Sequence, residues 1–203
     1  METGLTFSPA LGFAIPQYFE YRLVLHPGKE VYDRVIEEKE KFSRNYKVSV
    51  AKKTLPHITV VNFLAKERME ETIIKWMHRI ISEQRSFKVM LNNYSGFPSH
   101  TVHVRIQDYH PFKQLAASLK VIDQYVTSNG CPPVKFISNP HLTIAGRLQP
   151  SVYDKAISEY SRKTFHAIFT VDELILLKRE NQFDTCRQVS VFRFSQSPAE
   201  LFN

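Results

Sequence analysis

The chain has 203 residues, of which 43% are hydrophobic and 23% are charged. This composition is that of an ordinary globular protein and excludes a disordered or low-complexity chain. The length allows one large domain or two small lobes that share a core. The net charge of +7 and the pI near 9.4 favour anionic partners such as nucleotides or RNA. No block of five like charges occurs, so a basic nucleic-acid-binding tail is not expected.

Cysteine usage and the apolar runs predict a cytoplasmic protein. The chain has two cysteines, Cys131 and Cys186, with neither a CxxC pair nor zinc-ligand spacing, so a reducing compartment fits better than a disulfide framework. The N-terminal segment lacks a basic region and is broken by Pro9 and Pro16, which argues against a signal peptide. The most apolar helical run, residues 73–81, is short and charged, so no membrane span is expected.

Hydrophobic periodicity predicts alternating strands and helices after an irregular extension at residues 1–17. Strands are expected where β-branched and aromatic residues stand between turn signals, and helices where apolar residues recur at helical spacing. In chain order, the sequence predicts a strand at 18–27, a helix at 29–46, a strand at 55–63, a helix at 67–84, paired strands at 86–94 and 100–108, a helix at 111–128, a strand at 140–148, a helix at 151–164, and strands at 167–179 and 187–194.

The sequence repeats itself at an offset of 84 residues. Pro56-His57-x-Thr59 recurs as Pro140-His141-x-Thr143, and the pattern His-Pro-x-Lys that begins at His26 recurs at His110. Two separate patterns at one spacing indicate an internal duplication. We therefore expect an α+β fold that is internally duplicated and two-lobed, with antiparallel sheets lining a central cleft and helices packed outside. Residues 18–203 would form one bilobal domain, with pseudo-repeats at about 18–108 and 109–195.

The repeated His-x-Thr motif predicts a catalytic centre. Residues two apart on a strand share one face, so His57 and Thr59 point to the same side, as do His141 and Thr143. Across a phosphodiester, one imidazole can accept a proton while the other donates one, and the Thr hydroxyls can bind the non-bridging oxygens. This chemistry needs no metal, and no His-x₃-His or His/Cys spacing suggests one. No cofactor is expected.

At these residues the chain resembles the 2H phosphoesterase superfamily, and within it the 2′-5′ RNA ligase-like branch. The superfamily's paired motifs match His57-Ile58-Thr59-Val60 and His141-Leu142-Thr143-Ile144, and its duplicated α+β order matches residues 18–195. The resemblance implies metal-independent hydrolysis or transesterification of 2′,3′-cyclic phosphates or 2′-5′ linkages in nucleotides and RNA ends. Members of the branch often have Ala-Arg after the second motif, whereas this chain inserts a Gly before Arg147.

Five further residues are candidate substrate contacts. His103 and Arg105 share one face of a predicted strand and would meet phosphate or base if that strand flanks the cleft. Arg147 would reach the phosphate only through a bulge after the second motif. Phe97 and Phe183 lie in turns that would rim the cleft and could stack a base.

Two alternative functions use the same residues. One is a nucleotide- or RNA-binding module without turnover, and the other is ligation of RNA ends in the reverse direction. The presence of all four motif residues favours the hydrolase. Either histidine can serve as the base, since the roles swap when the reaction reverses. The sequence is compatible with a monomer.

Overall fold

The computed structural model describes residues 18–49, 54–180 and 184–195, so the predicted extension at residues 1–17 lies outside the described residues. The helical segments are α1 (Lys29–Tyr46), η1 (Glu67–Met69), α2 (Glu70–Ser82), α3 (His110–Ser118), α4 (Lys120–Ser128) and α5 (Pro150–Tyr160). The strands are β1 (Tyr18–Leu25), β2 (Ile58–Lys66), β3 (Phe87–Phe97), β4 (Thr101–Ile106), β5 (Lys135–Phe136), β6 (His141–Ala145), β7 (His166–Val171), β8 (Glu173–Arg179) and β9 (Arg187–Arg193).

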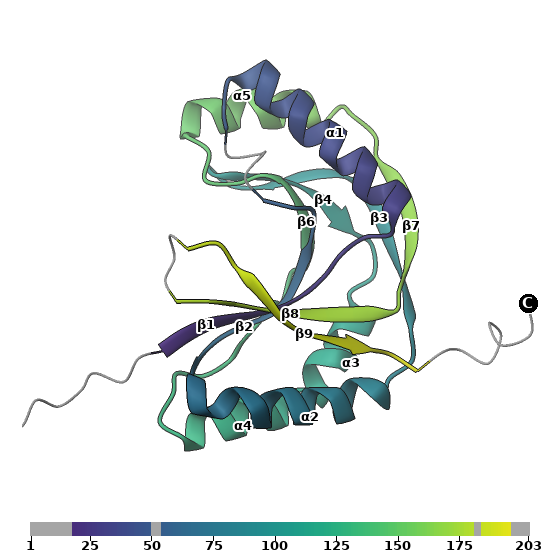
Figure 1. Ribbon diagram of the computed structural model, residues 1–203. Coiled ribbons are helices and arrows are strands. Elements are labelled where there is room, and N and C mark those ends of the chain that lie inside the picture. The colour runs from purple at the N-terminus through teal and green to yellow at the C-terminus, as the bar shows by residue number, and fades with distance from the viewer. Residues whose placement is uncertain (1–17, 50–53, 181–183, 196–203) are drawn as a thin grey trace, which may run out of the picture.

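The strands form two antiparallel sheets with helices on their outer sides. One sheet has the order β5-β2-β1-β8-β9, and the other has the order β6-β4-β3-β7. Helices α2, α3 and α4 lie outside the five-stranded sheet, and α1 and α5 lie outside the four-stranded sheet (Figure 1). We call the sheet faces turned away from the helices the inner faces. The two sheets contact each other through β2 and β6. The expected two-lobed α+β fold class is confirmed.

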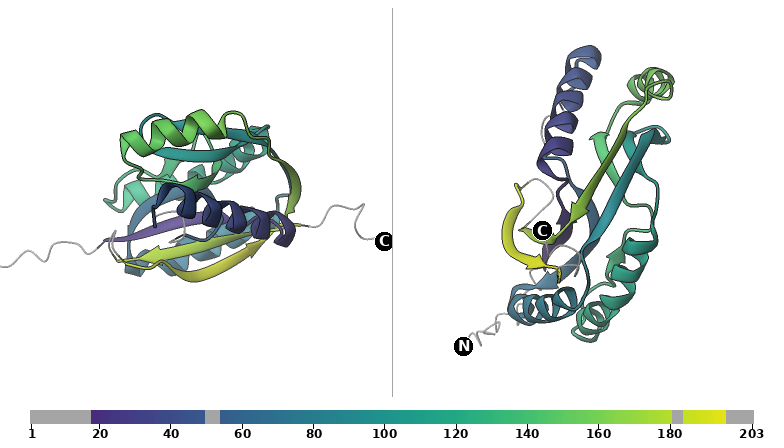
Figure 2. Two further views of the ribbon diagram at one scale, coloured as in Figure 1. Left: turned by 90° about the horizontal axis from the view of Figure 1, so that it is seen from above. Right: turned by 90° about the vertical axis from the view of Figure 1, so that its right-hand side faces the viewer.

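Each sheet takes strands from both halves of the chain. β1 and β2 are joined by β8 and β9, while β3 and β4 are joined by β6 and β7. The prediction of one strand at 167–179 is wrong, because the chain crosses between the sheets at Asp172 (Figure 2). Before this residue β7 pairs with β3, and after it β8 pairs with β1. Both segments are apolar and strand-forming, so their hydrophobic pattern does not reveal that the neighbouring strand changes from β3 to β1.

The two sheets contain matching groups of three strands. The order β2-β1-β8 in one sheet corresponds to β6-β4-β3 in the other, with a His-x-Thr motif at β2 and at β6. This correspondence equates β4 with β1, which is the first strand of the described residues. The predicted repeat at 18–108 includes β4 at its end. The repeat boundaries stay a prediction, and the sheet order favours a second repeat that begins near Thr101.

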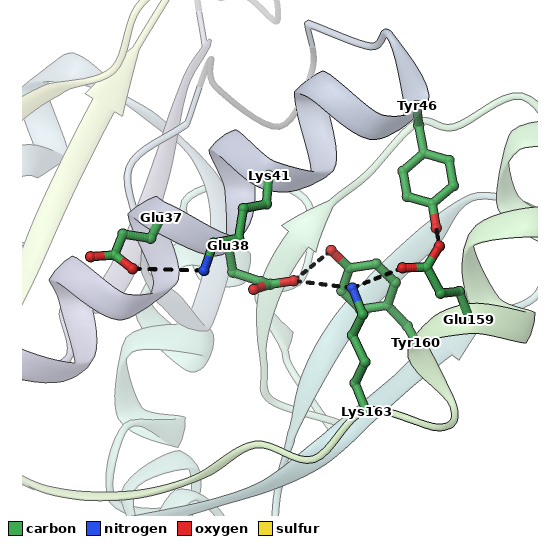
Figure 3. Close-up of polar contacts among 7 residues, drawn as sticks. All are labelled: Glu37, Glu38, Lys41, Tyr46, Glu159, Tyr160 and Lys163. Atoms are coloured by element: carbon green, nitrogen blue, oxygen red, sulfur yellow. Dashed lines mark hydrogen bonds and ion pairs between the residues drawn. The ribbon is translucent and has the colours of Figure 1, made fainter.

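Polar contacts hold α1 against α5 over the four-stranded sheet. Tyr160 donates a hydrogen bond to Glu38 on α1 (2.7 Å), and Tyr46 at the end of α1 donates one to Glu159 (2.6 Å). Lys163 lies between the two carboxylates, 3.7 Å from Glu38 and 3.0 Å from Glu159 (Figure 3). These contacts fix the position of α1, which also reaches the motif strands.

Gly96 on β3 is expected to be needed for the close approach of α5. A Cβ at residue 96 would lie 2.5 Å from Tyr153 Oη and 2.9 Å from its ring. Gly96→Ala is therefore expected to lower the free energy of unfolding by about 1–3 kcal/mol, measured by urea denaturation. Gly28→Ala is the control, because its Cβ would make an ordinary contact of 3.7 Å with Phe169, and its effect should stay within about 0.5 kcal/mol. Unchanged stability of Gly96→Ala would contradict this packing.

Candidate active site

The two motif histidines have the same local geometry. His57 directly precedes β2, and His141 is the first residue of β6. In each ring, Nδ1 lies 2.8 Å from the carbonyl oxygen two residues earlier, that of Leu55 or of Asn139. A backbone carbonyl only accepts hydrogen bonds, so Nδ1 carries the hydrogen in both neutral rings. Nε2 is then the atom of each ring that can take up a proton.

The strands place each Thr on the same side as its His. His57 and Thr59 are half-buried, and so are His141 and Thr143. The residue between the members of each pair, Ile58 or Leu142, is fully buried and belongs to the hydrophobic core. This alternation follows from the two-residue period of a strand. Both polar pairs therefore lie on inner faces, and the apolar residues between them anchor the strands.

A β-bulge follows the Thr of each motif. The pairing of β2 with β1 skips Val60, and the pairing of β6 with β4 skips Ile144. These two residues are the fourth positions of the two motifs. A bulge bends its strand, increases the local twist and re-aims the neighbouring side chains. The two motifs thus share a backbone irregularity as well as their residue types.

The two motif strands meet at the junction of the sheets. β2 and β6 belong to different sheets and contact each other there. A side chain of α1 reaches both segments: Lys39 Nζ lies 3.2 Å from Thr54 Oγ1, just before the first motif, and 3.4 Å from the carbonyl oxygen of Thr143. The fold therefore brings the strands of both His-x-Thr pairs to one junction.

Two aromatic rings surround His141. His103, opposite Thr143 on the neighbouring strand β4, has its ring centroid 4.9 Å from that of His141. Phe97 at the end of β3 stacks on His103 at 4.5 Å and meets the edge of His141 at 4.7 Å. The predicted site residues Phe97 and His103 thus lie beside the second motif. Their role as substrate contacts stays a prediction.

Burial keeps His103 neutral. Its side chain is only 5% exposed, and its Nδ1 is buried without a hydrogen-bond partner among the described residues. Burial is the main cause that lowers the pKa of His103 to about 4, and the neighbouring charges of His141 and Arg105 lower it further. At neutral pH this ring is therefore an uncharged neighbour of His141.

Burial also lowers the pKa of both motif histidines below 6.5. In each case the carbonyl bonded to Nδ1 opposes this effect, since it favours the protonated ring. Of these two pKa values, only that of His57 is lowered further by nearby positive charges, which are those of His26, Lys39 and Arg22. The two rings have the same backbone geometry and differ in the charges around them.

Of the three remaining predicted contacts, one lies beside a motif histidine in the strand register. Arg105 is opposite His141 in the strand register, but its side chain is exposed and its Nε donates to the carbonyl of Asn92 (3.2 Å). Arg147 is exposed beyond the end of β6, with a left-handed backbone conformation (φ 56°). Phe183 lies outside the described residues. Substrate contact by these three residues stays a prediction.

The structure adds two groups that the sequence reasoning missed. Lys39 occupies a core position of α1, four residues after Val35 and three before Phe42, which are both buried. That spacing is readable in the sequence as a lysine within an apolar stripe. On β1, Arg22 shares the inner face with Thr59, because it lies two residues from the strand partner of that Thr. Arg22 pairs with Glu20 (2.6 Å), which also binds Arg179; a lone Arg in a strand gives no sequence signal.

The described residues contain no group of three or more His, Cys, Asp or Glu side chains that could hold a metal ion. None of the helices in residues 18–49, 54–180 and 184–195 is long and apolar enough to span a membrane. A surface pocket of about 340 Å³ lies near the β8–β9 turn, lined in part by Lys178 and Arg187, and neither motif histidine lines it. The expected freedom from metal and the cytoplasmic location stay predictions.

The sequence matches the 2′-5′ RNA ligase superfamily over residues 31–183. The chain belongs to this superfamily. No curated protein sequence matches the chain.

Among solved structures, Escherichia coli LigT complexed with 3′-AMP is similar with a TM-score of 0.63 and 15% identity, covering 88% of this chain and 99% of that one. TT0787 of Thermus thermophilus is similar with a TM-score of 0.63 and 16% identity, covering 86% and 97%. LigT in its apo form has a TM-score of 0.62 and 17% identity, covering 88% and 99%. At these low identities, the structural similarity shows only that the chain has the same fold as these proteins.

The buried imidazole of His103 is expected to make stability depend on pH. Its pKa is about 4 in the folded protein, against 6.5 for an unperturbed imidazole, so the unfolded chain takes up the proton first as the pH falls. The free energy of unfolding should therefore decrease between pH 6.5 and pH 4, by up to roughly 3 kcal/mol from this residue. His57 and His141 contribute losses of the same sign.

Urea denaturation at neutral pH and at a pH near 4.5 measures this loss. His103→Leu should lose less stability than the wild type over the same interval, because it has no imidazole to protonate. His78→Leu is the control, since His78 is exposed on α2 and should leave the loss unchanged. Equal losses in the wild type and in His103→Leu would contradict the assignment.

Proposed function

We propose that the protein is a metal-independent phosphodiesterase that acts on 2′,3′-cyclic phosphate or 2′-5′ bonds of nucleotides or RNA ends. His57 and His141 serve as its general base and acid. The observation that supports this most is the repeated tautomer: both rings are fixed by a carbonyl at Nδ1, and each has Nε2 left for proton transfer. A core histidine that only fills space has no need of this arrangement twice on two strands in contact.

Hydrolysis of a 2′,3′-cyclic phosphate then proceeds by in-line displacement. One neutral imidazole accepts a proton from water at Nε2 while the water oxygen forms its bond to phosphorus. The bond from phosphorus to the 2′ or 3′ oxygen breaks, and the other imidazole, which is protonated, donates its Nε2 proton to that oxygen. The hydroxyls of Thr59 and Thr143 donate hydrogen bonds to the non-bridging oxygens, where negative charge develops. The product is a nucleotide monophosphate with a free hydroxyl.

The lowered pKa values of the two histidines fit a site that is completed by its substrate. Without ligand, burial favours the neutral form of both rings. The general acid must nevertheless be protonated when the reaction begins. A phosphodiester carries a negative charge, and a negative charge within a few ångströms raises the pKa of an imidazole. Substrate binding therefore promotes the protonation that one histidine needs.

Nucleotides or RNA ends are the proposed partners. The structurally similar LigT has been crystallised with 3′-AMP, NADP⁺ and ATP, all of which are nucleotides that carry phosphate. In this chain Arg22 and Lys39 add positive charge beside His57, which favours an anionic ligand. Phe97, which is half-buried beside His141, is the proposed contact for the base or sugar, and the buried ring of His103 supports it by stacking.

Replacement of either motif histidine is expected to abolish turnover without unfolding the protein. His57→Ala and His141→Ala should each lower kcat by about 10²–10⁴, the usual contribution of general acid–base catalysis. The measurement is turnover of the four 2′,3′-cyclic mononucleotides and a 2′-5′-linked dinucleotide after EDTA treatment. His78→Ala on α2 is the matched control and should retain full activity. Activity that EDTA removes would contradict a metal-independent mechanism, and nucleotide binding without turnover would favour the binding-module alternative.

The threonine hydroxyls are expected to act on the transition state. Thr59→Val and Thr143→Val keep the branched shape of the side chain and remove one donor, so each should lower kcat by about 10²-fold with little change in KM. Thr170→Val on β7 serves as the control, because β7 lies in the same sheet as β6 but carries neither motif. An increase in KM with unchanged kcat would instead assign these hydroxyls to ground-state binding.

A further inference from the structure

Lys39 carries a positive charge inside the protein without a carboxylate partner. Its side chain is 2% exposed on α1, and it forms no ion pair with any residue of the described ranges. Its Nζ has two neutral acceptors, the Thr54 hydroxyl at 3.2 Å and the Thr143 carbonyl at 3.4 Å. Burial lowers the pKa of Lys39 to about 8, so the amine remains mostly protonated at neutral pH. An unpaired buried charge is costly to the fold.

A second buried lysine, Lys178, has carboxylate partners for its charge, as expected of a lysine with a structural role. Lys178 on β8 is 1% exposed, and its Nζ lies 2.9 Å from Glu67 and 2.7 Å from Glu70. It also lies over the ring of Phe19, at 4.2 Å from the centroid. These partners neutralise its charge and raise its pKa, although burial opposes the change. Lys39 is buried to a similar extent but has no carboxylate partner among the described residues. Its positive charge therefore acts on the neighbouring groups.

The acceptors of Lys39 belong to the two motif segments. Thr54 stands three residues before His57, and the Thr143 carbonyl is part of the second motif. The charges that face His57 are those of Lys39 from α1 and of His26 and Arg22 from β1 and its end. His141 is faced from β4 by His103, which is neutral, and by Arg105, whose Nε is bonded to the Asn92 carbonyl. Arg105 is a positive charge beside His141, but its side chain is exposed to solvent, and Arg22 is paired with Glu20. The ammonium of Lys39 is buried and has no carboxylate partner among the described residues, so neither solvent nor a counter-charge offsets it.

We infer that Lys39 is a positioning residue that ties the two motif segments together and keeps His57 in its neutral, proton-accepting form. In the hydrolytic direction His57 is then the general base, and His141 is the general acid. This assignment rests on the proposed function, but the effect of Lys39 on His57 does not, because it concerns the protonation of the unliganded protein. A positive charge nearby disfavours a second positive charge on the imidazole, and the low-polarity surroundings strengthen the effect.

The test is a proton NMR titration of His57 and His141 in the wild type, in Lys39→Met and in Lys39→Gln. Both variants remove the charge, and the glutamine retains a hydrogen-bond donor. The pKa of His57 should rise in both variants, and the pKa of His141 should change less. Lys178→Met is the matched control: it removes an equally buried lysine and should leave the titration of His57 as it is in the wild type.

Thermal unfolding separates this role from a structural one. Lys39→Met should unfold at or above the wild-type temperature, because an apolar side chain replaces an unpaired buried charge. Lys178→Met should unfold at a lower temperature, because it leaves two carboxylates without their partner. Failure of both Lys39 variants to fold, while Lys178→Met folds, would overturn the inference and make Lys39 a structural residue. An unchanged His57 titration in folded Lys39→Met would also overturn it.

The pH dependence of turnover tests the assignment of base and acid. In Lys39→Met the ascending limb of kcat/KM should move to higher pH, in step with the NMR titration of His57. The wild type and the variant should converge above pH 8, where Lys39 itself loses its proton. A shift of the descending limb instead would make His57 the acid and overturn the assignment. If the wild type turns over no cyclic phosphate or 2′-5′ bond, the proposed function fails, while the NMR titration still decides the effect of Lys39.

Discussion

The architecture depends on an exchange of strands between the two sheets. β8 completes the sheet of β1 and β2, and β3 completes the sheet of β6 and β4, so neither half of the chain can satisfy its strand edges alone. An open edge exposes a row of unpaired N–H and C=O groups, which makes the exchange an obligatory part of folding. The exchange also binds the sheets to each other in the orientation where β2 and β6 make contact. The geometry of the candidate active site is thus a consequence of the topology.

The two motif histidines have nearly the same backbone geometry but different surroundings. The carbonyl at Nδ1 and the bulge after the Thr recur at both motifs, as expected of duplicated segments. The surroundings then diverge, with positive groups beside His57 and with Phe97 and His103 beside His141. Acid–base catalysis by two identical groups requires that their environments differ, so that one ring is neutral when the other is charged. The duplicated backbone supplies the common geometry, and the side chains that differ supply the distinction.

The sequence predicts the fold class and the motif positions well, because both depend on local patterns. His57 and Thr59 are adjacent on one strand face whatever surrounds them, and the apolar spacing of α1 and α2 identifies them as helices. Strand partners are a different matter, since they are decided by segments far apart in the chain. The crossing at Asp172 and the burial of His103 could not be predicted, because the hydrophobic pattern of a strand does not identify which strand pairs with it. Lys39 was readable as a polar residue in an apolar stripe, but its acceptors come from two distant segments.

The pairing of β1 with β8 has a consequence for how the protein is made. Glu20 on β1 lies opposite Arg179 on β8, so this partner of β1 is synthesised 159 residues after it, whereas the other partner, β2, follows much sooner. Until β8 emerges, β1 and β2 present one unpaired edge, and β3 waits for β7 in the same way. Contacts of such sequence separation slow folding, and nascent chains with open edges are prone to aggregate. The strand exchange therefore delays completion of both sheets until β7 and β8 have been synthesised.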